Sequence, residues 1–197
     1  DGPKSCREIS DTTIRKTIRG LDTIKGQGQA LMHFTESYRE FAHLKQPDPK
    51  TFSLTHLLQN LQTLHQPDMQ RQHIDFFLVF SRPEIMVCAD EILLSQVLIN
   101  LLKNAMQALE GQKDRKICMN VDAEKNQLLI RVTDNGPGIP SELAEDVFVP
   151  FFTTKATGSG IGLSLSRQII RMHGGELSVV SQPYRKTVFT ISLPVKV

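Results

Sequence analysis

The chain has 197 residues, 40% of them hydrophobic and 22% charged, and these values are ordinary for a folded, water-soluble domain. A formal net charge of +2 is too small to indicate a nucleic-acid partner or an acidic membrane surface. The cysteines at 6, 88 and 118 form no CxxC pair, so neither a zinc site nor a disulfide framework is expected and a reducing, cytoplasmic setting is favoured. No apolar run reaches the roughly 18 residues that span a bilayer, so any tether of a longer parent protein to the inner membrane would lie elsewhere.

The first predicted element is a long amphipathic helix over residues 9–44. Its apolar side chains recur at steps of three, four and seven, close to a heptad pattern: Ile14, Ile18, Leu21, Ile24, Leu31, Phe34, Tyr38 and Phe41. Such a narrow stripe needs a partner, which is either the domain that follows or the other half of a dimerising hairpin. The hairpin is favoured, because Gln-Pro-Asp-Pro at 46–49 then breaks the chain as a linker does. We therefore expect part of a hairpin at 1–45, a linker at 46–50 and one domain at 51–197.

The remaining elements alternate between short strands and helices. Strands are predicted at 51–53, 74–80, 84–88, 116–122, 127–134, 176–181 and 187–193, and helices at 54–65, 90–109 and 160–173. We expect a turn at 81–83 between the second and third strands, and a hairpin between the fourth and fifth. The segment 135–160 is irregular apart from a short helix near 141–146, and loops of this length are usually lids or binding loops. This order predicts an α+β fold, with helices on one face of a mixed, mostly antiparallel sheet.

Two of these helices carry a distinct apolar face. In the helix at 54–65 the face is formed by Leu57, Leu58, Leu61 and Leu64. In the helix at 90–109 it is formed by Ile92, Leu94, Val97, Leu98, Leu101, Leu102, Ala105 and Met106. A separate polar stripe on the second helix consists of Gln96, Asn100, Lys103, Asn104 and Gln107. Because Asn is unfavourable inside helices, the stripe is either an ordinary solvated face or a set of amide oxygens suited to a hard cation such as Mg²⁺.

The strand at 127–134 ends in a carboxylate that continues its apolar face. Alternation places Asp134 on the same side as Leu128, Ile130 and Val132. A half-buried carboxylate needs a hydrogen-bond donor. Gly136 and Gly138 remove side chains just beyond it, so an aminopurine ring could supply both the donor and a flat surface. An ordinary Asx turn explains the same residues, and this segment alone favours the turn.

A glycine-rich loop at 158–163 leads into the helix at 160–173. Exposed backbone amides and the positive end of a helix make an anion site. The spacing fits neither GxGxxG nor the P-loop, which excludes both of these nucleotide motifs. Lys155, just before the loop, could bind a terminal phosphate, although a single surface lysine is more often only a solvated charge.

Taken together, these segments resemble the catalytic ATP-binding domain of bacterial sensor histidine kinases. That domain belongs to a superfamily with gyrase B, the MutL mismatch-repair proteins and the large heat-shock chaperone ATPases. Residues 100–105 (Asn-Leu-Leu-Lys-Asn-Ala) look like the asparagine box, and residues 134–138 like the first glycine box. Residues 151–155 (Phe-Phe-Thr-Thr-Lys) look like the phenylalanine box, and residues 158–163 like the second glycine box. The resemblance covers roughly residues 51–195.

The resemblance implies a two-layer Bergerat-type sandwich that binds ATP and Mg²⁺, preceded by one long helix. It places Asn104 on Mg²⁺, Asp134 on the adenine amino group and residues 148–160 in an ATP lid, and it gives catalytic roles to Asn100, Asn104 and Lys155. The implied ATP-binding residues are Asn104, Asp134, Gly136, Gly138, Phe152, Thr153, Lys155, Gly158, Gly160, Ile161, Gly162, Leu163 and Thr187. Two positions depart from the family pattern, since Gln107 replaces a common Lys or Arg and residues 184–186 (Tyr-Arg-Lys) replace a glycine-rich turn before the last strand.

The resemblance also implies partners. The long N-terminal helix looks like the second helix of the family's dimerisation hairpin, so a homodimer and a response regulator receiver domain are expected, and no nucleic acid. None of the six histidines is followed by an acidic residue, as the phosphoacceptor should be, so that histidine is expected outside this fragment.

The type of reaction depends on position 100. The superfamily's ATPases carry a Glu four residues before the metal-binding Asn, and here that residue is Asn100, whose amide cannot take a proton at neutral pH. Transfer of the γ-phosphoryl group of ATP to a histidine, which needs no such base, is therefore favoured. A water-using ATPase of the same superfamily and a non-catalytic nucleotide-binding regulator are the alternatives.

Overall fold

The computed structural model describes residues 6–42, 44–123, 126–155 and 158–194. These residues fall into two compact units, one made of residues 1–44 with 154–159 and the other of residues 45–153 with 160–197. Within the described residues, no helix combines the length and the apolar character that a membrane span requires.

The first unit contains a single long helix, α1 (Cys6–Ala42), close to the predicted 9–44. The helix is continuous through its three glycines, and a Cβ added at any of them would meet nothing within 4 Å. The described side chains of the apolar stripe, from Ile14 to Leu31, are exposed. The stripe is thus available to a partner helix, and the dimerisation hairpin stays a prediction; the side chains of Phe34, Tyr38 and Phe41 lie outside the described residues.

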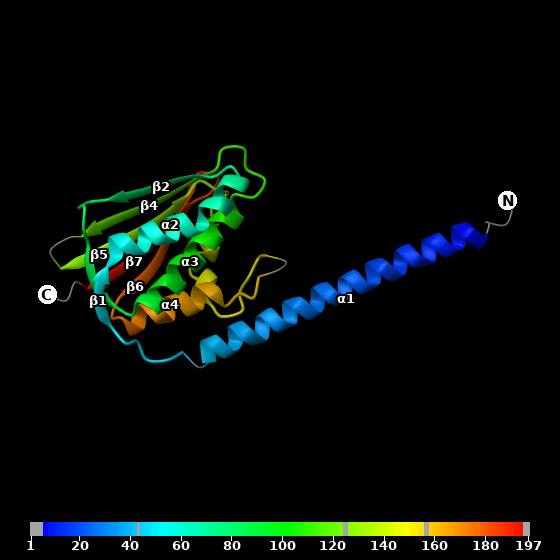
Figure 1. Cartoon of the computed structure of the whole chain (residues 1–197), viewed down its shortest axis with the longest axis horizontal. Helices are drawn as coiled ribbons and strands as arrows, with labels where there is room; N and C mark the ends of the chain where they lie inside the picture. The colour runs from blue at the N-terminus through cyan, green and yellow to red at the C-terminus, as the bar shows by residue number, and fades with distance from the viewer. Residues whose placement is uncertain (1–5, 43, 124–125, 156–157, 195–197) are drawn as a thin grey trace. The chain divides into compact units, whose positions relative to one another are not determined.

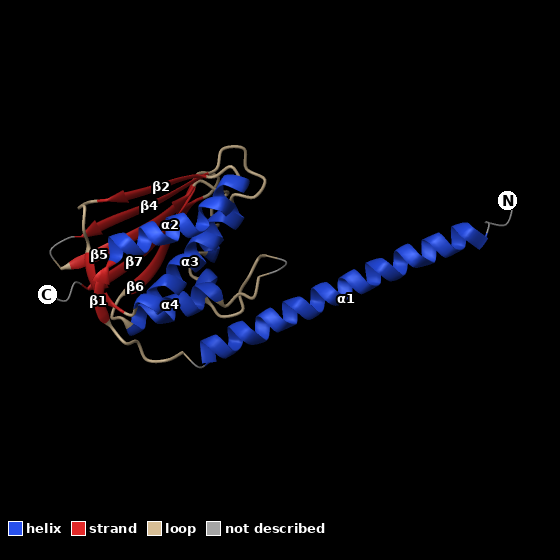
Figure 2. Cartoon of the chain, viewed as in Figure 1, coloured by secondary structure: helices blue, strands red, loops and turns tan. Residues whose placement is uncertain are grey.

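The second unit has two layers, a five-stranded sheet with three helices on one face (Figures 1 and 2). The sheet order is β2-β4-β5-β7-β6, and only the β2–β4 pair is parallel. The strands are β2 (Asp75–Phe80), β4 (Lys116–Ala123), β5 (Gln127–Asp134), β6 (Glu176–Gln182) and β7 (Lys186–Pro194). The helices are α2 (Leu54–Arg71), α3 (Glu91–Ala108) and α4 (Gly162–Met172). The predicted hairpin at 116–134 is present, as the antiparallel β4–β5 pair.

The core lies between the helices and the inner face of the sheet. The strands β4 and β5 alternate between buried and more exposed residues, as expected when one face is covered. Fully buried side chains from both layers include Leu54, Leu58, Leu94, Leu98, Leu101, Leu102, Ile117, Met119, Leu128 and Ile130. Between β5 and α4, two short 3₁₀ helices, η1 (Ser141–Leu143) and η2 (Asp146–Phe148), stand where one short helix is predicted.

The strands predicted at 74–80 and 84–88, with a turn between them, belong to different sheets. β3 (Met86–Ala89) pairs with β1 (Lys50–Ser53) in a separate two-stranded antiparallel sheet, whereas β2 lies at the edge of the large sheet. Lys50, assigned by the sequence to the linker, already belongs to β1. A turn signal shows that the chain changes direction, but it does not show which strand pairs with which.

The predicted helix at 54–65 is also too short. α2 continues through Pro67 to Arg71. A proline inside a helix costs about 3 kcal/mol, and the extra turn buries Met69, which recovers roughly 1.5–3 kcal/mol. The assignment of two residues to buried apolar faces is wrong. Leu64 is 64% exposed, because His65 takes the buried position beside it. Ile92, in the first turn of α3, is 80% exposed.

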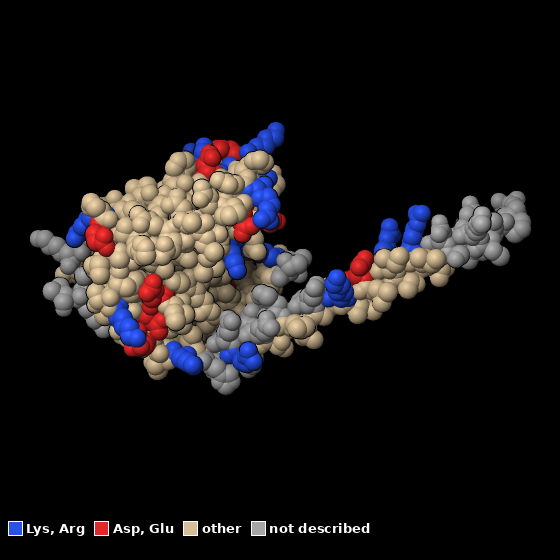
Figure 3. Space-filling view, in the orientation of Figure 1, with Lys and Arg blue, Asp and Glu red and all other residues tan. Residues whose placement is uncertain are grey.

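Figure 3 shows the charged side chains on one face of the second unit. On the face shown in Figure 3, acidic and basic residues interleave around the edge, and the centre is uncharged.

His65 is a buried titratable group in this core, with 7% of its surface exposed. Among the described residues, no hydrogen-bond partner lies within reach of its Nε2 atom. Burial, and secondly the charge of Lys103, lower the pKa of His65 below its ordinary value of 6.5. The folded protein therefore holds this ring in its neutral form.

We expect the free energy of unfolding to fall as the pH drops below about 6.5, because the unfolded chain then binds a proton at His65 that the folded chain binds only at lower pH. His65→Leu should remove this part of the pH dependence and raise stability by about 1 kcal/mol, since an unsatisfied buried nitrogen is lost. Urea unfolding at pH values above and below this range measures both effects. His56→Gln, at an exposed position on α2, is the control and should leave the pH dependence unchanged. If His65→Leu also leaves it unchanged, the explanation is wrong.

Candidate functional site

Asp134 is the last residue of β5, and its side chain is more deeply buried than the sequence predicts. Only 3% of its surface is exposed, and it extends the buried row formed by Leu128, Ile130 and Val132. Its Oδ1 atom accepts a hydrogen bond of 3.0 Å from the Gly136 amide. This bond forms an Asx turn, as one interpretation of the segment expects, and the turn holds a buried carboxylate. The binding of an aminopurine by this carboxylate stays a prediction.

Two hydroxyl groups lie at the same end of the sheet as the Asp134 carboxylate. Thr187 of β7 lies directly opposite Asp134 in the antiparallel pair, and only 3% of its surface is exposed. Ser181 of β6 lies opposite Thr187, with the two hydroxyl oxygens 3.5 Å apart. The Ser181 hydroxyl also accepts a hydrogen bond of 2.7 Å from the Ile139 amide. Sequence reasoning missed Ser181, although its place at the end of a predicted strand, six residues before Thr187, was a usable signal.

The turn after Asp134 is held against the β6–β7 hairpin. The Tyr184 amide donates to the Pro137 carbonyl at 2.7 Å. Gly138 has a φ of 79°, and a Cβ there would lie 2.8 Å from the Gln182 carbonyl oxygen. Where the family often has glycine, Tyr184 itself takes the left-handed backbone, with a φ of 59°. The turn before β7 therefore forms with a non-glycine residue at this position.

Gly136 is required by the protein's own packing. A Cβ at this position would lie 2.8 Å from Asp134 Oδ1 and 3.1 Å from the carbonyl oxygen of Ala108, at the end of α3. The absence of a side chain at Gly136 is therefore already required by the carboxylate and by α3. The approach of a ligand to this backbone stays a prediction.

The polar stripe of α3 meets the start of α4. The Asn100 side chain donates to the Ser166 hydroxyl at 2.9 Å, and Asn104 Nδ2 lies 3.5 Å from Asn100 Oδ1. A Cβ at Gly162 would lie only 2.5 Å from Asn100 Oδ1. Asn100 therefore fastens the two helices together, while Asn104, one turn further along α3, is half-buried.

The loop between η2 and α4 is closed at its neck. The Phe151 amide donates to the Gly160 carbonyl at 2.9 Å, and both residues have a left-handed backbone, with φ values of 70° and 67°. Phe152 and Thr153 follow the neck on one side, and Ile161, which is fully buried, and Leu163 follow it on the other. α4 begins at Gly162, so the first-turn amides of a helix, which bind anions readily, lie next to Asn100.

The start of the same loop is anchored on the core. Phe148 is buried against Phe189 of β7, with the rings edge to face and their centroids 6.3 Å apart. The guanidinium of Arg167 on α4 lies 4.5 Å from the centroid of the Phe148 ring and is paired with Glu145 at 3.2 Å. Sequence reasoning missed Arg167, which no motif marks.

The second unit thus brings together most of the predicted site residues along α3. This helix touches the Asp134 turn at Ala108 and the start of α4 at Asn100, eight residues away. Eight residues of helix span about 12 Å. Lys155 and Gly158 fall in the segment 154–159, which belongs to the other unit, so their part in the site stays a prediction.

Residues 89–197, more than half of the chain, match the family described as histidine kinase-, DNA gyrase B- and HSP90-like ATPase. The chain belongs to this ATPase family. It is 36% identical to the signal transduction histidine-protein kinase AtoS of Escherichia coli K12, over 95% of the chain and 29% of AtoS. It is 29% identical to the sensor protein FixL of Bradyrhizobium diazoefficiens, over 94% of the chain and 37% of FixL. The chain therefore spans about a third of the length of these curated relatives.

Solved structures of histidine kinases are also similar to this chain. The catalytic domain of histidine kinase ThkA matches with a TM-score of 0.70 and 34% identity, over 75% of the chain and 96% of that domain. ThkA in complex with the response regulator protein TrrA matches over 100% of the chain and 53% of the ThkA chain, with a TM-score of 0.72 and 26% identity. The predicted α+β fold and the predicted ATP-binding domain of the histidine kinase type are thus confirmed.

Gly136→Ala should weaken ATP binding about tenfold or more, or about 1.4 kcal/mol, because the added methyl group displaces the Asp134 carboxylate. Isothermal titration calorimetry measures the affinity, and urea unfolding shows whether the domain remains folded. Gly20→Ala in α1, where a Cβ meets nothing within 4 Å, is the control. A folded Gly136→Ala variant with unchanged affinity would show that the position of the carboxylate does not matter for ATP.

Proposed function

We propose that this chain is the ATP-binding catalytic part of a sensor histidine kinase, and that it transfers the γ-phosphoryl group of ATP to a histidine outside residues 1–197. The observation that carries the proposal is the arrangement along α3. A buried carboxylate lies at one end of that helix, beside Ala108. Asn104 lies four residues from Ala108, and Asn100, which contacts the start of α4, lies eight residues from it. Membership of the family supports the same function.

The Asp134 end suits adenine. The exocyclic amino group of adenine donates hydrogen bonds, and a buried carboxylate accepts them. Guanine carries a carbonyl oxygen at the same ring position, and two acceptors facing each other in a buried site are unfavourable. The Asp134 carboxylate would therefore select ATP over GTP, with the Thr187 hydroxyl on the adjacent strand as a second polar contact.

The other end suits a triphosphate with its metal ion. The amide oxygen of Asn104 is a ligand type that Mg²⁺ accepts, and a bound Mg²⁺ would neutralise charge on the phosphates. The backbone amides at the start of α4 would bind phosphate oxygens, and Lys155 would add a cation. Asn100, fixed by Ser166, keeps α4 in register with Asn104 and supplies no base to activate water.

Asn104→Ala should weaken binding of ATP in the presence of Mg²⁺ by about tenfold, or about 1.4 kcal/mol, but should affect ATP alone much less. The reason is that only the metal-bound form uses the amide oxygen. Calorimetry with Mg²⁺ and with a chelator separates the two affinities, and Gln96→Ala on the same stripe is the control. Equal losses under both conditions would reject Asn104 as the metal ligand.

The phosphotransfer itself is tested on a longer protein that includes the residues before position 1. After incubation with γ-labelled ATP, we expect label on the protein that is lost in acid and stable in base, as phosphohistidine is. Free phosphate without labelled protein would indicate an ATPase, and neither product would indicate a nucleotide-binding regulator. The same protein with Asp134→Asn, which turns one acceptor of the buried carboxylate into a donor, should remain unlabelled.

The proposal includes two partners. The exposed apolar stripe of α1 would pair with a second helix in a homodimer. A response regulator would receive the phosphoryl group, as the complex of ThkA with TrrA suggests for the relative. ATP and such a regulator are both found in the cytoplasm, which is where this part of the protein would act.

A further inference from the structure

Residues 173–175 (His-Gly-Gly) are not explained by the nucleotide site. The two glycines have a steric role, since Gly174 has a φ of 76° and a Cβ at Gly175 would collide with the Ser192 carbonyl oxygen. They allow the chain to turn sharply from α4 into β6. This turn gives no reason for a histidine at position 173.

Both ring nitrogens of His173 are engaged. Nε2 accepts a hydrogen bond of 2.9 Å from the backbone amide of Asp90, and Nδ1 lies 2.8 Å from the carbonyl oxygen of Ile169. Nε2 must be unprotonated to accept, and Nδ1 must carry a hydrogen to donate, so the contacts select one neutral tautomer. Through this ring, the end of α4 is joined to the residue that precedes α3.

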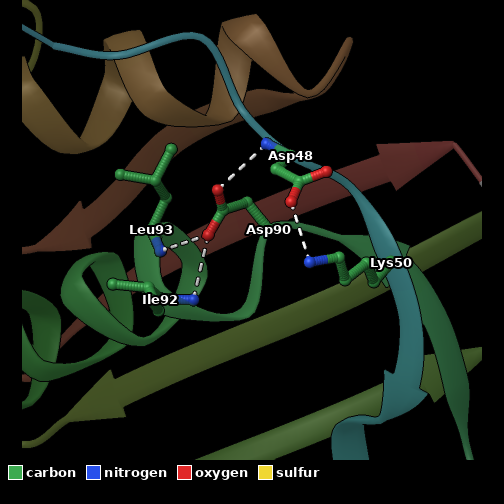
Figure 4. A network of polar contacts seen from close by, with 5 residues as sticks. All are labelled: Asp48, Lys50, Asp90, Ile92 and Leu93. Atoms are coloured by element: carbon green, nitrogen blue, oxygen red, sulfur yellow. Dashed lines mark hydrogen bonds and ion pairs between the residues drawn. The ribbon is translucent and has the colours of Figure 1, made fainter.

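Asp90 makes two further sets of contacts with its side chain (Figure 4). Oδ1 accepts hydrogen bonds of 3.1 Å from the amides of Ile92 and Leu93 and so caps the start of α3. Oδ2 accepts a hydrogen bond of 3.0 Å from the amide of Asp48. This last bond is the leading cause of a lowered pKa for the Asp90 carboxyl group, so the ionised form holds all three amides.

Asp48 belongs to the second unit and lies between the end of α1 and β1. β1 and β3 pair from Ser53 with Met86 to Lys50 with Ala89, and the bond from Asp48 to Asp90 continues this pairing just beyond the ladder. The ion pair between Lys50 and Asp48 lies beside it, with both side chains about three-quarters exposed. Residues 46–49 are therefore tied to Asp90, which caps the first turn of α3 and contacts His173 at the end of α4.

We propose that Asp90 and His173 are positioning residues that couple residues 46–49 to the nucleotide site. The contacts among the Asp48 amide, Asp90 and His173 form what we term the linker clamp. α3 carries Asn100 and Asn104, and α4 presents the amides for phosphate, so nucleotide that fixes the two helices also fixes the clamp. Coupling of this kind is reciprocal, so the state of the linker changes nucleotide affinity by the same factor. The inference rests on the proposed function, because it requires that ATP binds between these helices.

The test measures hydrogen exchange at the Asp48 amide in this chain, with and without saturating Mg²⁺ and ATP. In the wild-type chain we expect ATP to slow this exchange about threefold or more, because the clamp opens less often. Asp90→Asn keeps an oxygen to cap α3 but places an NH₂ group opposite the Asp48 amide. The ATP-dependent slowing should then disappear while the chain still binds ATP. Lys50→Gln, which removes the exposed ion pair and keeps the Asp48 bond, is the matched control and should behave as the wild type.

The role of His173 is tested by a pair of variants. His173→Phe removes both hydrogen bonds and should lower ATP affinity about three- to tenfold, whereas His173→Gln, which can accept and donate at similar positions, should recover most of the loss. A residue with only a space-filling role would not show this recovery.

The outcomes separate the two proposals. If the wild-type chain does not bind ATP in calorimetry, the proposed function fails whatever the clamp does. If it binds ATP but exchange at Asp48 is unchanged, or if Asp90→Asn keeps the full ATP effect, the linker clamp is wrong and the proposed function stands. If a variant fails to fold, the effect of ATP on exchange at the Asp48 amide of the wild-type chain alone decides whether the linker clamp is correct.

Discussion

The second unit is organised around one buried charge-bearing group, the carboxylate of Asp134 at the end of an apolar row. Burying such a group is unfavourable unless hydrogen-bond donors surround it. The turn after β5 brings the Gly136 amide to it, and the close approach of α3 requires that residue 136 has no side chain. The same turn is fixed from the other side by the β6–β7 hairpin through Tyr184 and Gly138. The geometry of this end of the sheet therefore follows from the need to satisfy a single acidic side chain.

α3 connects the Asp134 turn to the other residues of the site. One end packs on the Asp134 turn, the middle is fastened to α4 through Asn100 and Ser166, and the first turn is capped by Asp90. Because a helix is stiff, groups on three of its turns keep fixed spacings. The side-chain amide of Asn100 is also engaged in contacts with Ser166 and Gly162. This fits a domain in which a second substrate, rather than water, receives the phosphoryl group.

The sequence predicts the elements of this fold well, because hydrophobic periodicity marks each of them, and the joint set of motifs identifies the family. The pairing of strands is harder to predict from the sequence. No local pattern shows that β3 pairs with β1 rather than with β2, because this choice depends on contacts between distant segments. Leu64 and His65 show a second limit, because a one-residue rotation of a helix decides which of two neighbours is buried. Arg167 and Ser181 carry no motif, and their contacts arise only when α4 and β6 are placed beside the loop and the turn. The ligand roles of the motif residues remain predictions.

The neck between Phe151 and Gly160 separates the loop from the rest of the domain. A backbone hydrogen bond and two left-handed residues fix the points where the loop leaves and re-enters the domain. Whatever lies between these points closes a ring whose ends are already joined, and doubling the length of such a ring costs only about 0.6 kcal/mol in closure entropy. Because the neck fixes both ends, a change in the length of the loop should cost the folded domain little stability.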